Sequence, residues 1–206
     1  MDELADQPAK IKLPEGQYDA YLFDCDGTLV DSMPLHFRAW QHALKDRQCD
    51  FDERLFYSWG GKPVRDIIAE LNRMNHLSLP IEIVASSKER YFKRLLPELK
   101  GIPAVIEQVN HLYGKGRLAV VSGGKRELVF ASSERMKLVE RFELFVCAGD
   151  YPNGKPAPDC FLMAAEKLGV QPSKCLVFED TELGIAAATR AGMQSVHVKT
   201  ARSLRS

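Results

Sequence analysis

Short apolar segments that alternate with helical segments constrain the fold of this chain more than any other feature. Five segments have the composition of buried strands, namely residues 20–23, 118–121, 144–147, 175–178 and 195–198. Apolar residues recur at helical spacing in the stretches between them. Parallel strands covered on both faces are nearly continuous apolar runs, and each needs a helix to cross back to the next. We therefore expect an α/β fold with a doubly wound parallel sheet.

One long interruption of this alternation predicts a second, smaller unit. Between the first and second strand segments lie three helical patterns and no strand, covering about residues 34–47, 64–75 and 83–96. A compact insertion of three or four helices fits this length. We predict a core domain of residues 18–31 and 99–200, a small α-helical cap of residues 32–98, and a flexible N-terminal leader of residues 1–17, which lacks periodicity.

Composition limits the partners of the chain. Lys and Arg total 28 and Asp and Glu total 28, so the formal net charge is zero and no general attraction to nucleic acid or membrane is expected. No apolar run approaches the roughly 18 residues of a membrane span, and the N-terminus lacks a signal-peptide pattern. Five irregularly spaced cysteines indicate reduced thiols. We expect a cytoplasmic protein, either a monomer or a weak homodimer.

Polar residues follow one strand segment after another. They are Asp24 and Asp26 after the first strand, Ser122 after the second, Lys155 in the loop after the third, and Glu179 and Asp180 after the fourth. The carboxyl ends of parallel strands lie at one edge of the sheet, so these side chains are expected to meet there. Asp24 and Asp26 taken alone are equally compatible with a solvated acidic turn that closes a strand.

The gathered carboxylates predict a bound cation, because their mutual repulsion costs several kcal/mol unless a positive charge neutralises it. Oxygen ligands without His or Cys favour Mg²⁺, which also accepts a substrate phosphate oxygen. Lys155, Ser122 and the backbone N–H groups of the turn that includes Gly123 are suited to the remaining phosphate oxygens.

Four motifs resemble those of the haloacid dehalogenase superfamily, in its β-phosphoglucomutase-like subgroup of phosphatases and phosphomutases with a helical cap. They are Asp24-Cys25-Asp26-Gly27-Thr28, Val121-Ser122, the segment from Gly154 to Asp159, and the segment from Phe178 to Ile185. The resemblance covers about residues 18–199. It implies a core of the Rossmann-like type, a nucleophilic Asp24 that forms an aspartyl phosphate, and Asp26 as general acid and base. It also implies Mg²⁺ held by Asp24, the Asp26 carbonyl and Asp180, with Glu179 beside them.

The same resemblance suggests cap residues that contact substrate, each with a plainer alternative. His36 matches a cap-entry histidine that contacts substrate or shields Asp26, but packing at the hinge explains a histidine there equally well. Lys88 aligns with a cap lysine that reaches into such sites, against the alternative of a solvated helix lysine. Lys125 matches a lysine that binds the distal phosphate of a bisphosphate in the mutases.

One departure from the mutase pattern favours hydrolysis. Val64 stands where the mutases have a cap arginine for the second phosphate, and Lys62 or Arg65 would have to replace it. We therefore predict a Mg²⁺-dependent phosphohydrolase of a small phosphorylated metabolite, in particular a sugar phosphate. The resemblance to small phosphatases that act on sugar phosphates such as fructose 1-phosphate points the same way. The alternatives are a phosphomutase of the β-phosphoglucomutase type and, against the retained motif residues, a catalytically idle binding module.

Overall fold

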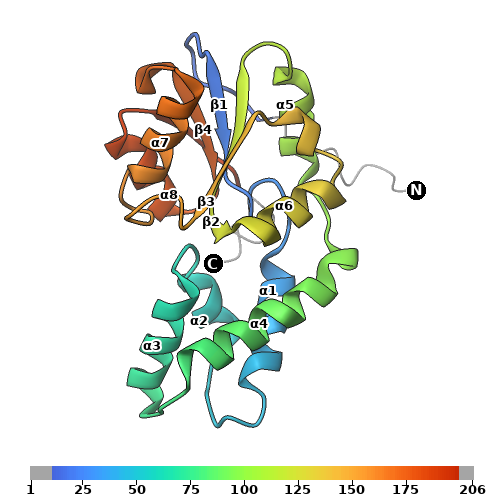
Figure 1. Cartoon of the computed structure of the whole chain (residues 1–206), viewed down its shortest axis with the longest axis vertical. Coiled ribbons are helices and arrows are strands. Elements are labelled where there is room, and N and C mark those ends of the chain that lie inside the picture. Colours follow the sequence, from blue (N-terminus) through green and yellow to red (C-terminus); the bar gives the residue numbers. More distant parts are fainter. Residues whose placement is uncertain (1–10, 200–206) are drawn as a thin grey trace, which may run out of the picture.

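The computed structural model describes residues 11–199 of the chain. A five-stranded, wholly parallel sheet flanked by helices forms the core, and a separate group of helices lies at the carboxyl edge of the sheet (Figure 1). The strands are β1 (Ala20–Phe23), β2 (Arg117–Lys125), β3 (Leu144–Ala148), β4 (Cys175–Glu179) and β5 (Gln194–His197). The predicted doubly wound α/β fold with an inserted helical cap is confirmed.

Strand β1 occupies the centre of the sheet, in the order β3-β2-β1-β4-β5. Phe23, its last residue, lies opposite Val120 of β2 and Phe178 of β4. The next residue of each chain segment therefore lies at the same level along the sheet. This register brings Asp24, Val121 and Glu179 side by side at the carboxyl edge.

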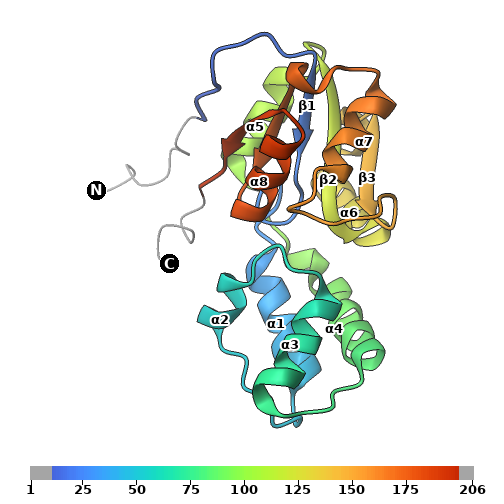
Figure 2. The same ribbon diagram turned by 90° about the vertical axis from the view of Figure 1, so that its left-hand side faces the viewer.

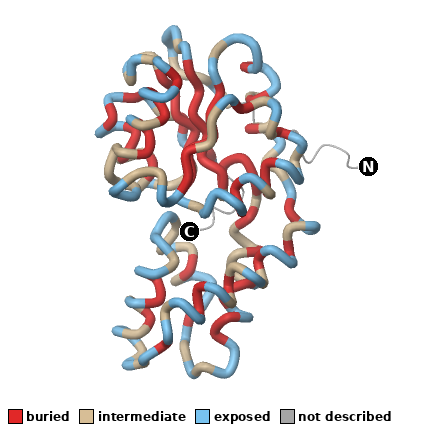
Figure 3. The backbone as a smooth tube through the Cα atoms, viewed as in Figure 1, coloured by how far each residue is buried: buried red, intermediate tan, exposed pale blue. Residues whose placement is uncertain are grey.

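Alternate residues of the strands pack into two apolar clusters, one on each face of the sheet. Tyr21 and Phe23 face the cluster that includes α5 (Pro103–Leu112) and α6 (Arg126–Arg135). Ala20 and Leu22 face the cluster that includes α7 (Asp159–Leu168) and α8 (Glu182–Arg190). Figure 3 shows the strands as the buried centre of this domain. Both faces are thus covered, which explains why the strands are apolar throughout.

The cap has its own apolar cluster, separate from the two of the core. Its helices are α1 (Met33–Leu44), α2 (Glu53–Ser58), α3 (Val64–Asn75) and α4 (Ile81–Leu95). Trp40, Ile68, Leu71 and Val84 lie at its centre, each 2% exposed or less. Figure 2 shows the four helices gathered beneath the core. The cap is therefore a packed body that can hold side chains in fixed positions over the sheet edge.

Two chain segments join cap and core, and hydrogen bonds tie them together. The Asp31 N–H donates to the Lys100 carbonyl at 2.9 Å, and the Ile102 N–H donates to the Leu29 carbonyl at 3.0 Å. A short 3₁₀ helix, η1 (Leu96–Glu98), follows α4, and Glu98 pairs with Arg38 of α1. The hinge thus consists of two connecting segments joined by backbone hydrogen bonds, which limit the relative positions of cap and core.

The structure differs from the predicted elements at two places. The helical stretch predicted between the second and third strand segments is shorter than that interval: helix α6 ends at Arg135, and Lys137 has a left-handed φ of 57°, which no helix continues through. A 3₁₀ turn, η2 (Val139–Arg141), follows it. The short helix α2 has no predicted counterpart, because six residues are too few for a periodic pattern. Its start is fixed by Asp52, whose carboxylate accepts from the Leu55 N–H at 2.7 Å.

The expected N-terminal leader lies mostly outside the described residues, which begin at residue 11. Within the described part, Ile11 and Leu13 are half-buried against the first core cluster. The Tyr18 hydroxyl lies 2.6 Å from Oε1 of Gln194 on β5. A third 3₁₀ helix, η3 (Pro172–Lys174), precedes β4.

Candidate active site

All ten side chains or turn residues expected at the site line one cleft of about 2080 Å³ between the core and the cap. The core contributes Asp24, Asp26, Ser122, Gly123, Lys125, Lys155, Glu179 and Asp180, and the cap contributes His36 and Lys88. The strand ends thus converge as the sequence predicts. The roles of the individual residues follow from their contacts.

A buried ammonium group connects three strands at the bottom of the cleft. Lys155 Nζ donates to Asp24 Oδ1 at 2.6 Å, to Glu179 Oε1 at 2.7 Å and to the Val121 carbonyl at 3.2 Å. Its side chain is only 7% exposed. Burial lowers the pKa of Lys155, but the charges of Asp24 and Glu179 outweigh burial and raise this pKa well above its usual value. Lys155 is therefore a permanent positive charge against Asp24.

Glu179 is held in place by hydrogen bonds from its neighbours. Its second oxygen, Oε2, accepts from the Thr181 N–H at 2.8 Å and from the Thr181 hydroxyl at 2.9 Å. A Cβ on Gly184 of α8 would lie 1.8 Å from Glu179 Oε1, so only glycine leaves room for this carboxylate. The sequence groups Glu179 with the metal ligands, and in the structure it is also a partner of Lys155.

Asp180 lies in a niche formed by the turn after β1. The Thr28 hydroxyl donates to Asp180 Oδ1 at 2.9 Å. A Cβ on Gly27, whose φ is +88°, would lie 2.2 Å from Asp180 Oδ2. Burial and the charge of Glu179 raise the pKa of Asp180 to about 7, against the lowering effect of the Thr28 hydrogen bond. The glycine and threonine of the first motif therefore serve to seat this carboxylate.

These carboxylates fit a cation of the Mg²⁺ type. Burial and the neighbouring acids also raise the pKa of Asp24 well above its usual value, although Lys155 opposes this rise. One lysine thus does not neutralise the group, and a further positive charge would. Within residues 11–199, no three His, Cys, Asp or Glu side chains are arranged to hold a metal together. Two carboxylates, a backbone carbonyl, water and a substrate oxygen make the set that Mg²⁺ accepts.

Asp26 has a different environment from Asp24, although only one residue separates them. The Ser32 hydroxyl donates to Asp26 Oδ1 at 2.6 Å, and His36 Nε2 lies 3.2 Å from the same oxygen. Burial raises the pKa of Asp26, but His36 and Ser32 outweigh burial and lower this pKa to about 2. Asp26 is therefore ionised in this arrangement. Sequence reasoning did not identify Ser32, because a serine at a helix start carries no distinguishing signal.

His36 and Lys88 form a buried chain that leads to Asp26. Lys88 Nζ lies 2.9 Å from His36 Nδ1, and the imidazole stacks on Phe92 at 3.9 Å between ring centroids. Burial and the charge of Lys88 lower the pKa of His36, so the ring is neutral near pH 7. Its partners set the tautomer, with Nδ1 accepting from Lys88 and Nε2 donating to Asp26. Lys88 is only 5% exposed, so the alternative of a solvated helix lysine is wrong.

The C-terminal part of β2, where its register with β3 shifts, presents backbone N–H groups to the cleft. The Ser122 hydroxyl accepts from the Gly124 N–H at 3.1 Å, and the Tyr151 hydroxyl donates to the Ser122 carbonyl at 3.1 Å. A Cβ on Gly123 would meet no atom within 4 Å, which leaves the backbone there open to a ligand. Tyr151 is a second positioning residue that the sequence did not reveal, because it lies in the irregular loop after β3.

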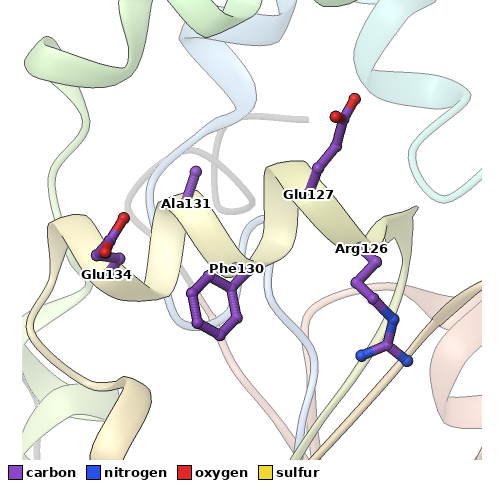
Figure 4. Close-up of a pocket in the computed structure, with 5 residues that line it drawn as sticks. All are labelled: Arg126, Glu127, Phe130, Ala131 and Glu134. Atoms are coloured by element: carbon purple, nitrogen blue, oxygen red, sulfur yellow. The ribbon is translucent and has the colours of Figure 1, made fainter.

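A shallow depression lies apart from this cleft, along one face of helix α6. Figure 4 shows its five lining residues, Arg126, Glu127, Phe130, Ala131 and Glu134, on successive turns of that helix. Arg126 points away from the other charged groups toward Asp150, with which it pairs at 2.6 Å. A single helix face encloses no ligand, so the depression is a surface feature.

Comparisons with known proteins agree with this geometry. The family described as haloacid dehalogenase-like hydrolase matches residues 21–198. The fructose-1-phosphate phosphatase YqaB of Escherichia coli is 33% identical over 89% of this chain and 97% of its own length. The β-phosphoglucomutase of Bacillus subtilis is 30% identical over 87% of this chain and 82% of its own length. The crystal structure of a β-phosphoglucomutase from Clostridium difficile covers 92% of this chain and 88% of its own, with a TM-score of 0.81 and 23% identity, which supports the fold alone.

No helix within the described part of the chain is both long and apolar enough to cross a membrane.

Substitution of Lys88 by methionine is expected to stabilise the protein while impairing the site. Burial lowers the pKa of Lys88 from 10.5 to about 8, so the charged form is disfavoured in the folded state by up to about 3 kcal/mol. Lys88→Met should therefore raise the free energy of unfolding at pH 7 by about 2 kcal/mol. Urea denaturation measures this change.

The pH dependence and a matched control test the same prediction. The unfolded chain binds the proton of Lys88 more tightly, so wild-type stability rises between pH 8 and pH 10.5 and the advantage of Lys88→Met shrinks there. Lys93→Met removes a lysine that is 47% exposed on the same helix and should change stability by less than about 0.5 kcal/mol. A loss of stability in Lys88→Met at pH 7 would contradict the reasoning.

Proposed function

The chain belongs to the haloacid dehalogenase-like hydrolase family, and we propose that it is a phosphatase of small phosphorylated metabolites, sugar phosphates in particular, that uses Asp24 as nucleophile and Mg²⁺ as cofactor. One observation carries the proposal. Asp24 and Asp26 lie at the same end of β1 but have opposite partners, since the ammonium of Lys155 faces Asp24 whereas Ser32 and His36 hold Asp26.

In the first step, a carboxylate oxygen of Asp24 attacks phosphorus, and the bond from phosphorus to the ester oxygen breaks. The leaving alkoxide takes a proton from Asp26, so an alcohol departs and the phosphoryl group stays on Asp24. Two anions meet in this step. Lys155, 2.6 Å from Asp24 Oδ1, and the N–H groups of the turn after Ser122 supply compensating positive charge for the nonbridging oxygens.

In the second step, water attacks phosphorus and Asp26 takes its proton. A base must be ionised, and the hydrogen bonds from Ser32 and His36 lower the pKa of Asp26 to about 2, with burial opposing them. The present arrangement therefore suits the second step. Before the first step Asp26 must hold a proton, which requires an exchange of those hydrogen bonds.

Mg²⁺ would be held by Asp24, the carbonyl of Asp26 and Asp180, and when bound it supplies the positive charge that the buried carboxylates and the phosphate together need. Thr28 and Gly27 keep Asp180 in place for this role. Glu179, which the sequence groups with these ligands, lies beside them and also accepts a hydrogen bond from Lys155.

The substrate class follows from the cap and from the relatives. The catalytic core contacts only the phosphate, so selection of the rest of the molecule falls to the cap side of the cleft. The similarity to a phosphatase named for fructose 1-phosphate supports a phosphorylated sugar. A cytoplasmic location and a monomeric or weakly dimeric state remain predictions.

The phosphomutase alternative has less support in the cap. Val64, at the place of the mutase arginine, lines the cleft. Of its two possible substitutes, Arg65 pairs with Glu82 at 2.9 Å, and the ammonium of Lys62 lies 4.6 Å from the ring centroid of Trp59. A second phosphate would have to compete with these neighbours for either cation, which favours water as the acceptor.

Asp24→Asn should abolish turnover while the fold is retained. The amide has nearly the same shape as the carboxylate but cannot form the acyl phosphate, so phosphate release from fructose 1-phosphate should fall by at least about 10³-fold. Circular dichroism checks the fold. Residual activity within tenfold of the wild type would remove Asp24 from the role of nucleophile.

Chelation should inactivate the enzyme reversibly. EDTA treatment followed by gel filtration is expected to reduce hydrolysis of an aryl phosphate to background, and added Mg²⁺ is expected to restore it, since the carboxylates repel phosphate without a cation. Elemental analysis of the treated protein is the control. Full activity in verified metal-free protein would refute the proposed cofactor.

The fate of the phosphoryl group separates phosphatase from mutase. With β-glucose 1-phosphate and a bisphosphate primer, inorganic phosphate should accumulate many times faster than glucose 6-phosphate, because a second phosphate would have to compete for Lys62 or Arg65 with their neighbours. Both products are measured in one reaction. Faster formation of glucose 6-phosphate would establish the phosphomutase alternative.

A further inference from the structure

We propose that Glu89 is a specificity-determining residue that favours substrates with a single phosphate, because its carboxylate forms an ion pair with the ammonium of Lys125. The inference rests on the proposed function and deepens it. Glu89 belongs to cap helix α4, and Lys125 is the last residue of β2, three residues after Ser122. Both line the cleft.

The two side chains are in close contact, but Glu89 is much more buried than Lys125. Lys125 Nζ lies 2.7 Å from Glu89 Oε2, and the Glu89 side chain is 15% exposed whereas that of Lys125 is 58% exposed. The carboxylate is thus the fixed member of the pair, and the lysine is a solvated arm that reaches across from the core. A ligand that drew Lys125 away would leave a mostly buried carboxylate without its partner.

Three of the other cations that line the cleft already have close partners. Carboxylates that line the cleft outnumber its Lys and Arg residues by nine to six. Lys155 is paired with Asp24 and Glu179, Arg65 is paired with Glu82, and Lys88 is buried against His36. One phosphate beside Lys155 and a metal suits this balance, and a second phosphate does not.

The selection is therefore by repulsion. A second phosphate that approached Lys125 would meet the carboxylate of Glu89 at the same place, whereas an uncharged hydroxyl end of a sugar would not.

A neighbouring ion pair provides a matched control. Lys93 of α4 and Glu127 of α6 also join cap to core, at 3.0 Å, but neither lines the cleft. The Glu127 side chain points away from Arg126 in Figure 4. Glu127→Gln thus breaks a similar bridge between the same two bodies without freeing a lysine of the cleft.

The test is calorimetric binding with the full chain carrying Asp24→Asn, in the presence of Mg²⁺, so that no turnover intervenes. The probes are fructose 1-phosphate and fructose 1,6-bisphosphate. Addition of Glu89→Gln should tighten bisphosphate binding roughly tenfold, about 1.4 kcal/mol, and change monophosphate binding less than twofold. Glu127→Gln should leave both affinities within twofold. Lys125→Met added to Glu89→Gln should remove the gain.

Three results would overturn the inference: no gain in bisphosphate affinity with Glu89→Gln, an equal gain for both probes, or the same gain with Glu127→Gln. If circular dichroism shows that Glu89→Gln does not fold, bisphosphate binding by Lys125→Met provides the test. If Glu89 already engages Lys125, Lys125→Met should reduce bisphosphate affinity less than twofold. A tenfold loss would refute the inference. Phosphate release by the wild type tests the proposed function separately, so the two can fail independently.

Discussion

The arrangement of the active site depends on one buried ammonium group, that of Lys155. A charge at 7% exposure is tolerated only where opposite charges and hydrogen bonds compensate its lost hydration. Asp24, Glu179 and the Val121 carbonyl supply that compensation from three adjacent strands. The register that places Asp24, Val121 and Glu179 at one level is therefore a requirement of the site as well as of the sheet. Gly184 follows from the same constraint, because any larger residue would displace Glu179.

The two catalytic carboxylates differ because their partners come from different bodies. Asp24 contacts Lys155 of the core, and burial raises its pKa. Asp26 contacts Ser32 and His36, which lie at the entry to the cap, and its pKa is about 2. A movement of the cap about the paired hinge segments would alter the surroundings of Asp26 and leave those of Asp24 in place. In the proposed mechanism, proton transfer by Asp26 would thus depend on the position of the cap, whereas attack by Asp24 would not.

The sequence predicts the fold and the convergence of the site well, because both follow from periodicity and from the geometry of parallel strands. It does not predict individual side-chain contacts that depend on how side chains from different segments are oriented toward each other. Ser32 with Asp26, Tyr151 with the Ser122 carbonyl, and Glu89 with Lys125 are of this kind. Glu179 illustrates the same limit, since the sequence places it at the correct strand end but cannot tell whether its oxygens face a metal or Lys155.

Whether the phosphoryl group passes to water or to another sugar hydroxyl is decided outside the catalytic core. Both outcomes use the same nucleophile, the same acid and base and the same phosphate-binding turn, so Asp24, Asp26 and Lys155 do not distinguish them. Transfer between two positions of a sugar requires a bisphosphate that is held at both ends. In this chain Lys125, Arg65 and Lys88 are each engaged by a neighbouring protein group on the cap side. The charge pairing of the cap, and not the chemistry of the core, therefore favours hydrolysis.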